Sequence, residues 1–157
     1  FMLKVMISYP DEAAEVEVLR QHHEGFRMTA DPLPGVEQVA GEEEIRLVWQ
    51  AAAAVRVHPE VMRYVAMLTR QTRRMPSLVL GASPRAGTDL LTAAKTLAMF
   101  RGKSYLTPDE VKRVAAPVLR QRLPLQPEAE IEAQTVEAVL EEVFRSVDVP
   151  RMSDADA

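Results

Sequence analysis

Residues 81 to 86 read Gly-Ala-Ser-Pro-Arg-Ala and combine the parts of an anion-binding site at the start of a helix. Ser83 is a favourable N-cap residue, because its hydroxyl can accept from a backbone N–H one turn further along. Pro84 falls at the first helical position, where it removes no intrahelical hydrogen bond. Arg85 is the unusual choice, since a cation in the first turn faces the positive end of the helix dipole. An anion bound there would contact the guanidinium and the free N–H groups together. The alternative is an Arg85 that points to solvent or pairs with a nearby carboxylate.

Apolar residues at helical spacing surround this motif and predict a mainly α-helical chain. Thr107, Pro108 and Glu110 form the pattern of a capping box at the start of one helix. Gly102 is placed to end the helix that begins at Pro84, and Pro117 predicts a kink in the following one. The stripes are Ile45, Val48, Trp49, Ala52; Val61, Val65, Leu68; Leu90, Ala94, Leu97, Ala98; Val111, Val114, Ala115, Val118; and Val136, Val139, Leu140, Val143.

The first forty residues follow a different pattern. Residues 3 to 8 alternate between apolar and other side chains, which predicts a strand whose partners must lie elsewhere, because one strand cannot form a sheet. A helix is expected from Pro10 and Asp11 to about His22. Residues 25 to 40 hold Pro32, Pro34 and Gly35 as well as Gly25, so we expect an irregular connection there.

Composition excludes several classes of site. The 157 residues contain no cysteine, which rules out disulfides and thiolate metal sites and agrees with a reducing cytosol. No apolar run approaches the length needed to span a membrane. The net charge of −4 argues against general nucleic-acid binding, which usually needs a basic face. Aromatic residues make up 5%, so the core must be aliphatic, and we expect the eight methionines to fill it.

Other candidate residues favour structural roles. The histidines, His22, His23 and His58, show no metal-ligand spacing and are expected at the surface. Four arginines make one predicted helix and its end basic, which indicates a solvated face or a contact with an acidic neighbouring subunit. These residues are Arg63, Arg70, Arg73 and Arg74.

The stretch from Ser77 to Leu123 strongly resembles the C-terminal lid of the MoxR family of AAA+ ATPases. The resemblance rests on "GASPRA", "AAKTLA…RG", "YLTPDEV" and "VLRQRL". Upstream, FMLKVMISYPDEAAEVEVLR is similar to the last strand of the ATPase core and the step out of it, and VRVHPEVMRYVAMLTRQTRR resembles the first lid helices. The similarity extends from Phe1 to about Pro150. It departs at Gln121, where the family usually has histidine, and keeps Arg122.

The resemblance implies a helical lid bundle preceded by one remnant core β-strand. Residues 1–24 would be the remnant of the core, with its last strand and exit helix, and residues 25–41 an irregular linker. Residues 42–150 would form the helical lid, and residues 151–157 a disordered tail.

The resemblance also implies a function. The chain would be the nucleotide-responsive (sensor 2) lid that couples ATP binding and hydrolysis to conformational change in a chaperone-like ring. Arg85 would contact the terminal phosphate, with Ser83 beside it at the nucleotide. ATP and Mg²⁺ would bind the full-length parent, whereas this chain should bind neither tightly and should be inactive alone. It has no Gly-x-x-x-x-Gly-Lys-Ser/Thr phosphate loop and no paired carboxylates after a strand.

The implied partners are the chain's own ATPase core, the neighbouring subunits of a homo-oligomeric ring, and proteins with a von Willebrand A domain. The implied location is the cytoplasm, with no nucleic-acid partner and no membrane insertion. Two other functions remain open from the residues alone. One is a non-enzymatic helical module that binds a partner helix. The other is a helix-turn-helix DNA-binding protein that uses residues 84–101 and 108–122, although the acidic balance disfavours it.

Overall fold

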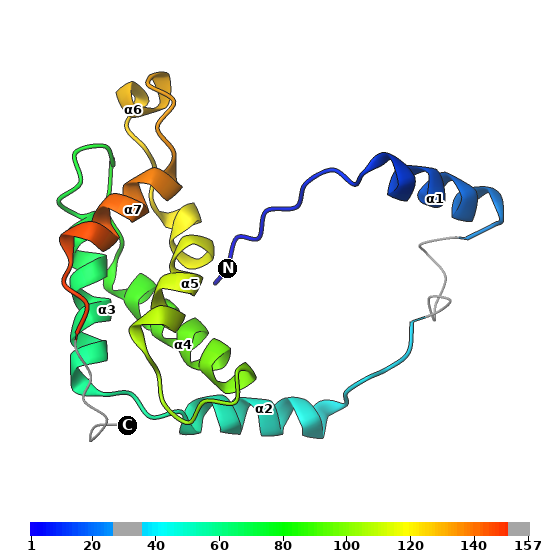
Figure 1. The fold of residues 1–157 in the computed structure, drawn as a ribbon, viewed down its shortest axis with the longest axis horizontal. Coiled ribbons are helices and arrows are strands. Elements are labelled where there is room, and N and C mark those ends of the chain that lie inside the picture. Colours follow the sequence, from blue (N-terminus) through cyan, green and yellow to red (C-terminus); the bar gives the residue numbers. More distant parts are fainter. Residues whose placement is uncertain (27–35, 151–157) are drawn as a thin grey trace. The chain divides into compact units, whose positions relative to one another are not determined.

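The computed structural model describes residues 1–26 and 36–150, and within these residues every regular element is a helix (Figure 1). The mainly α fold class is therefore as predicted. The expected tail at 151–157 and residues 27–35 of the expected linker lie outside the described residues. In chain order the helices are α1 (Glu12–His23), α2 (Glu42–Ala54), α3 (Pro59–Thr72), α4 (Pro84–Phe100), α5 (Pro108–Leu119), the short 3-10 helix η1 (Arg120–Arg122), α6 (Pro127–Ile131) and α7 (Val136–Ser146).

The chain divides into two compact units, residues 6–46 and residues 1–5 with 47–157. Helix α1 belongs to the first of these. It begins after Asp11, whose carboxylate accepts a hydrogen bond from the Ala14 N–H at 2.9 Å. Its first turn is acidic and its last turn basic, which suits the helix dipole, and none of its residues is buried.

In the larger unit, α4 packs against α3 and α5, and α7 packs against α3 and α5 (Figure 1). The core between them is mainly aliphatic, as the composition predicts. Of the six described methionines, only two fit the prediction: Met75 is buried and Met99 packs against the core, whereas the other four are exposed. Met62 and Met67 are two of these, because they fall outside the buried stripe of α3. The fully buried leucines are Leu68, Leu90, Leu106, Leu119, Leu123 and Leu140.

The predicted boundaries of α4 hold, and α5 runs through its proline. Gly102 has φ +70°, and its N–H donates to the Met99 carbonyl at 2.9 Å, which ends α4 in the way that favours glycine. Helix α5 continues past Pro117 to Leu119 before it tightens into η1. The proline therefore does not end the helix, and the carbonyl of Pro117 accepts from the N–H of Lys4 at 2.8 Å.

Residues 3 to 8 form no strand, which corrects the expected remnant of a sheet. An alternating sequence becomes a strand only when a neighbouring strand satisfies its backbone groups, and the described residues supply none. The remaining pairings are two isolated bridges, one between Arg56 and Tyr105 and one between Leu78 and Leu125. No helix in the described parts of the chain has the length and apolar character needed to cross a lipid bilayer.

A buried carboxylate joins the end of α4 to the start of α5. The Glu110 side chain is fully buried and accepts from the Thr107 N–H at 3.3 Å, as part of the predicted capping box, which is present, and from the Thr107 hydroxyl. Lys103 Nζ donates to it at 2.8 Å and Arg101 Nη1 at 3.1 Å. Burial by itself raises the pKa of Glu110, but these hydrogen bonds and the positive charge of Lys103 outweigh it and lower the pKa to about 2. Glu110 is therefore an ionised structural anchor.

Candidate functional site

The first turn of α4 presents Ser83, Pro84 and Arg85 at the surface, all three exposed. Ser83 has the extended backbone of an N-cap residue, and Pro84 occupies the first turn, as predicted. The expected capping bond is missing, however: the Ser83 hydroxyl caps no N–H of the helix. Only the Ser83 carbonyl takes part, accepting from the Ala86 N–H at 3.0 Å. The Ser83 hydroxyl is therefore available to another partner.

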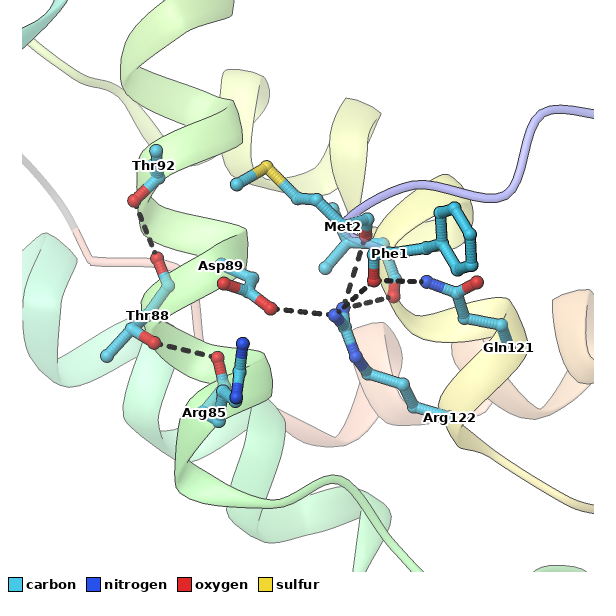
Figure 2. Close-up of polar contacts among 9 residues, drawn as sticks. Phe1, Met2, Arg85, Thr88, Asp89, Thr92, Gln121 and Arg122 are labelled. Carbon is cyan, nitrogen blue, oxygen red and sulfur yellow. Dashed lines mark hydrogen bonds and ion pairs between the residues drawn. The ribbon is translucent and has the colours of Figure 1, made fainter.

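Arg85 is fixed through its backbone and free at its guanidinium. The Thr88 hydroxyl donates to the Arg85 carbonyl at 2.8 Å, and the Thr92 hydroxyl donates to the Thr88 carbonyl at 3.0 Å (Figure 2). The Arg85 side chain makes no hydrogen bond or ion pair with any of the residues described. A guanidinium without a partner among the described residues, beside the N–H groups of a helix start, is suited to an anion such as phosphate.

The loop before α4 is held by residues at the end of α3. Thr72 is buried, and its hydroxyl accepts from the Ala82 N–H at 2.9 Å while donating to the Thr69 carbonyl at 2.7 Å. Arg73 Nε donates to the Ala82 carbonyl at 2.8 Å. Arg73 therefore has an intrachain role, which the reading of the basic residues as a solvated face or subunit contact did not anticipate. Both bonds hold Ala82, the residue before the N-cap, and thereby set where α4 begins.

Gly81 lets this loop approach α3 closely. A Cβ at Gly81 would lie 2.5 Å from both the Cα and the N of Arg73, a distance that side chains do not tolerate against backbone. Sequence reasoning singled out the motif that Gly81 opens but did not identify this contact. The signal was present, because an isolated glycine in a short connection is typical of a close backbone approach.

We expect Gly81→Ala to destabilise the chain by about 1–3 kcal/mol, because the loop must move away from Arg73 to admit the methyl group. The matched control is Gly87→Ala inside α4. There the new Cβ would meet Thr69 Cγ2 at an ordinary 3.5 Å, and the change should stabilise by about 0.5–1 kcal/mol. Thermal melting of the two variants should therefore move in opposite directions. An unchanged melting temperature for Gly81→Ala would contradict the close approach.

An apolar groove of about 370 Å³ lies beside this turn, between α3 and α4. Met62, Val65 and Leu91 line it, Pro84 lies in its wall, and Arg70 contributes the basic side. The sequence analysis did not identify this groove, because its walls come from two helices whose packing is not encoded locally.

Asp89 and Arg122 form an ion pair near the candidate site. Arg122 Nη2 lies 2.7 Å from Asp89 Oδ2, and each side chain is 20% exposed. Figure 2 shows Asp89 on α4 between the first turn and the Arg122 guanidinium. Neither residue was selected as a site residue from the sequence, although Arg122 was noted within "VLRQRL".

The histidines contribute no site chemistry. His22 and His23 are exposed, as predicted. His58 instead caps α3, with its Nδ1 accepting from the Glu60 N–H at 3.2 Å. Across residues 1–26 and 36–150, no group of three or more histidine, cysteine or acidic side chains is arranged to hold a metal ion. The described residues thus fit a phosphate at Arg85 but provide no ligand set for Mg²⁺.

Comparison with known proteins identifies the family. Residues 70–143 match the model of the AAA lid domain. The chain is 30% identical over 162 residues to Chaperone MoxR1 of Mycobacterium tuberculosis, covering 98% of this chain and 41% of that protein. It is 29% identical over 150 residues to the protein YeaC of Bacillus subtilis, covering 96% of this chain and 45% of that one.

A solved structure agrees with these relatives. The crystal structure of a protein from Cytophaga hutchinsonii, assigned as an ATPase, superposes with a TM-score of 0.80 at 25% identity. The match covers 96% of this chain and 47% of that one, so the chain spans less than half the length of each of the three proteins. Residues 70–143 form an AAA lid domain, and nearly the whole chain is similar to the lid-containing part of MoxR-like AAA+ ATPases.

Proposed function

We propose that this lid responds to nucleotide and couples ATP binding and hydrolysis to conformational change in a chaperone-like ring. The observation that supports the proposal is the exposed Arg85 guanidinium in the first turn of α4, which pairs with none of the described residues. A cation at that position opposes the helix dipole and gains nothing from the described residues, so its partner is expected to be an external anion.

In this proposal Arg85 contacts the terminal phosphate, and Ser83 lies beside it with a hydroxyl that the helix does not use. ATP supplies the transferable phosphoryl group, and Mg²⁺ is held by groups that the described residues do not provide. The Arg85 guanidinium stabilises negative charge as it develops on the phosphoryl oxygens. Because Arg85 lies on α4, loss or movement of the phosphate that it binds would shift α4 and with it the rest of the lid.

The proposed partners are the ATPase core that the resemblance to the MoxR family implies and the neighbouring subunits of a homo-oligomeric ring. A protein with a von Willebrand A domain and a location in the cytoplasm are further proposals from the family. The experiment that tests the function is replacement of Arg85 in an assembled ATPase that contains this lid. Turnover must fall while ring assembly and the melting temperature are retained.

The 157-residue chain by itself is expected not to hydrolyse ATP. One arginine and one helix start can bind phosphate oxygens, but the sequence has no phosphate loop and the described residues have no magnesium-binding cluster. The measurement is release of inorganic phosphate by the purified chain, with a complete family ATPase as the positive control. Turnover that copurifies with the folded chain through successive steps would contradict this expectation.

A further inference from the structure

Three consecutive side chains of η1 bind the main chain of residues 1–5, which we term the entry segment. Arg120 Nη1 donates to the Lys4 carbonyl at 3.1 Å, and Gln121 Nε2 donates to the Phe1 carbonyl at 2.8 Å. Arg122 donates to the Phe1 carbonyl at 2.9 Å and to the Met2 carbonyl at 3.3 Å. Because every acceptor is a backbone oxygen, this recognition does not depend on the side chains of the entry segment.

Apolar burial contributes little to holding the entry segment. Met2 is 40% exposed, Leu3 45% and Val5 72%, so much of their surface remains in water. Among the described residues, one backbone–backbone hydrogen bond holds the entry segment, from the Lys4 N–H to the Pro117 carbonyl at 2.8 Å. The polar contacts from η1 must therefore supply most of the attachment.

Arg122 is the side chain that joins the entry segment to α4. Its Nη2 bonds Asp89 Oδ2 at 2.7 Å as well as the Phe1 carbonyl, and its Nη1 bonds the Val118 carbonyl at 2.8 Å as well as that of Met2 (Figure 2). A single planar guanidinium thus binds acceptors on the entry segment, α4 and α5. Only arginine has enough donors in a fixed fork to do this.

Asp89 lies four residues after Arg85 in α4, and residues at this spacing share one face of a helix. The carboxylate that orients Arg122 is therefore one turn from the proposed phosphate contact. A 33-residue separation in the sequence is bridged by one ion pair.

We propose that Asp89 and Arg122 form a clasp that fixes the entry segment to helix α4, with Arg122 as the positioning residue. Asp89 holds the guanidinium in the orientation in which its remaining donors meet the Phe1 and Met2 carbonyls. The clasp would transmit a displacement of the entry segment to α4, the helix that carries Arg85. This consequence rests on the proposed function. The clasp itself does not.

Hydrogen–deuterium exchange on the 157-residue chain tests the clasp. Arg122→Gln should accelerate exchange of the Lys4 amide tenfold or more, which corresponds to about 1.4 kcal/mol of local opening free energy. Asp89→Asn should accelerate exchange of the Lys4 amide to a similar extent. The double variant should exchange less than about twofold faster than the faster single variant, because both substitutions remove the same interaction. Arg113→Gln, an exposed arginine on α5, is the matched control and should leave the Lys4 amide unchanged.

Protection across α4 should remain in these variants, because its buried residues Leu90, Ala94 and Ala98 hold it in the core. Arg122→Lys should give intermediate exchange, since an ammonium keeps the attraction to Asp89 but cannot reach all four acceptors. Unchanged exchange at Lys4, additive single effects, or loss of protection throughout α4 and α5 would each overturn the clasp. If exchange behaves as expected while Arg85→Ala leaves ATP turnover unchanged, the clasp stands and the proposed function fails.

Discussion

Arg85→Ala is expected to lower ATP turnover tenfold or more in an assembled ATPase that contains this chain as its lid. A charge-assisted hydrogen bond is worth about 1.5–3 kcal/mol, and each 1.4 kcal/mol of transition-state stabilisation corresponds to about tenfold in rate. The fold should survive, because Pro84 still starts the helix and the exposed Arg85 side chain makes no hydrogen bond or ion pair with the described residues. Removing a cation from a helix N-terminus can even raise stability slightly.

The measurements are steady-state ATPase assays and thermal melts of both proteins under conditions where the ring is assembled. Arg113→Ala is the matched control, since it removes an exposed arginine of α5 from the same lid. Arg85→Lys distinguishes a point charge from a guanidinium fork, and we expect it to recover only part of the turnover. Unchanged turnover for Arg85→Ala would remove Arg85 from the site, whereas a strongly lowered melting temperature would make it a structural residue.

Glu110→Gln is expected to destabilise the chain by about 2–4 kcal/mol at neutral pH. The neutral amide leaves Lys103 and Arg101 without their common carboxylate and weakens the bonds to Thr107, and breaking a buried ion pair carries a cost of this order. In a chain of this size each kcal/mol lowers the melting temperature by about 2–4 °C. The comparison is with Glu141→Gln, an exposed glutamate of α7 that should have almost no effect.

The same pair of proteins should show a defined pH dependence. The folded-state pKa of Glu110 is about 2, below its ordinary value of 4.5, so the ionised form is the one that stabilises the fold. Its contribution, about 3 kcal/mol from the pKa difference, is present above pH 4.5 and is lost as the pH falls toward 2. Chemical denaturation should find the stability difference between the parent and Glu110→Gln shrinking through this window. A difference that stays constant from pH 7 to pH 3 would show that the charge is not what stabilises the junction.

The sequence alone determined helices α1 to α5 and α7 and most of their boundaries, because these depend on residues a few positions apart, whereas the short α6 falls where a linker was expected. Pro84 starts α4, Gly102 ends it, and Glu110 folds back onto the N–H of Thr107. Each effect operates within one helical turn, so the pattern in the chain is sufficient to predict it. The resemblance carried by the "GASPRA" and "YLTPDEV" segments likewise predicted the lid, which the family match over residues 70–143 confirms.

The tertiary structure decided which distant side chains meet. Asp89 and Arg122, like Thr72 and Ala82, are brought together by helix packing, and nothing at either position specifies its partner. Packing also brought Lys103 and Arg101 within hydrogen-bond distance of the Glu110 carboxylate. The residue that caps α5 therefore also forms buried ion pairs with the end of α4 and the turn after it.

The failure at residues 3 to 8 has the same origin. Their alternation of apolar and other side chains is compatible with a strand, but a strand also needs a neighbouring strand to pair with its backbone groups. Lacking one, the entry segment is held through its carbonyls by Arg120, Gln121 and Arg122, three side chains more than a hundred residues away in the chain. Local chemistry set the conformations available to each segment, and contacts between distant segments selected among them.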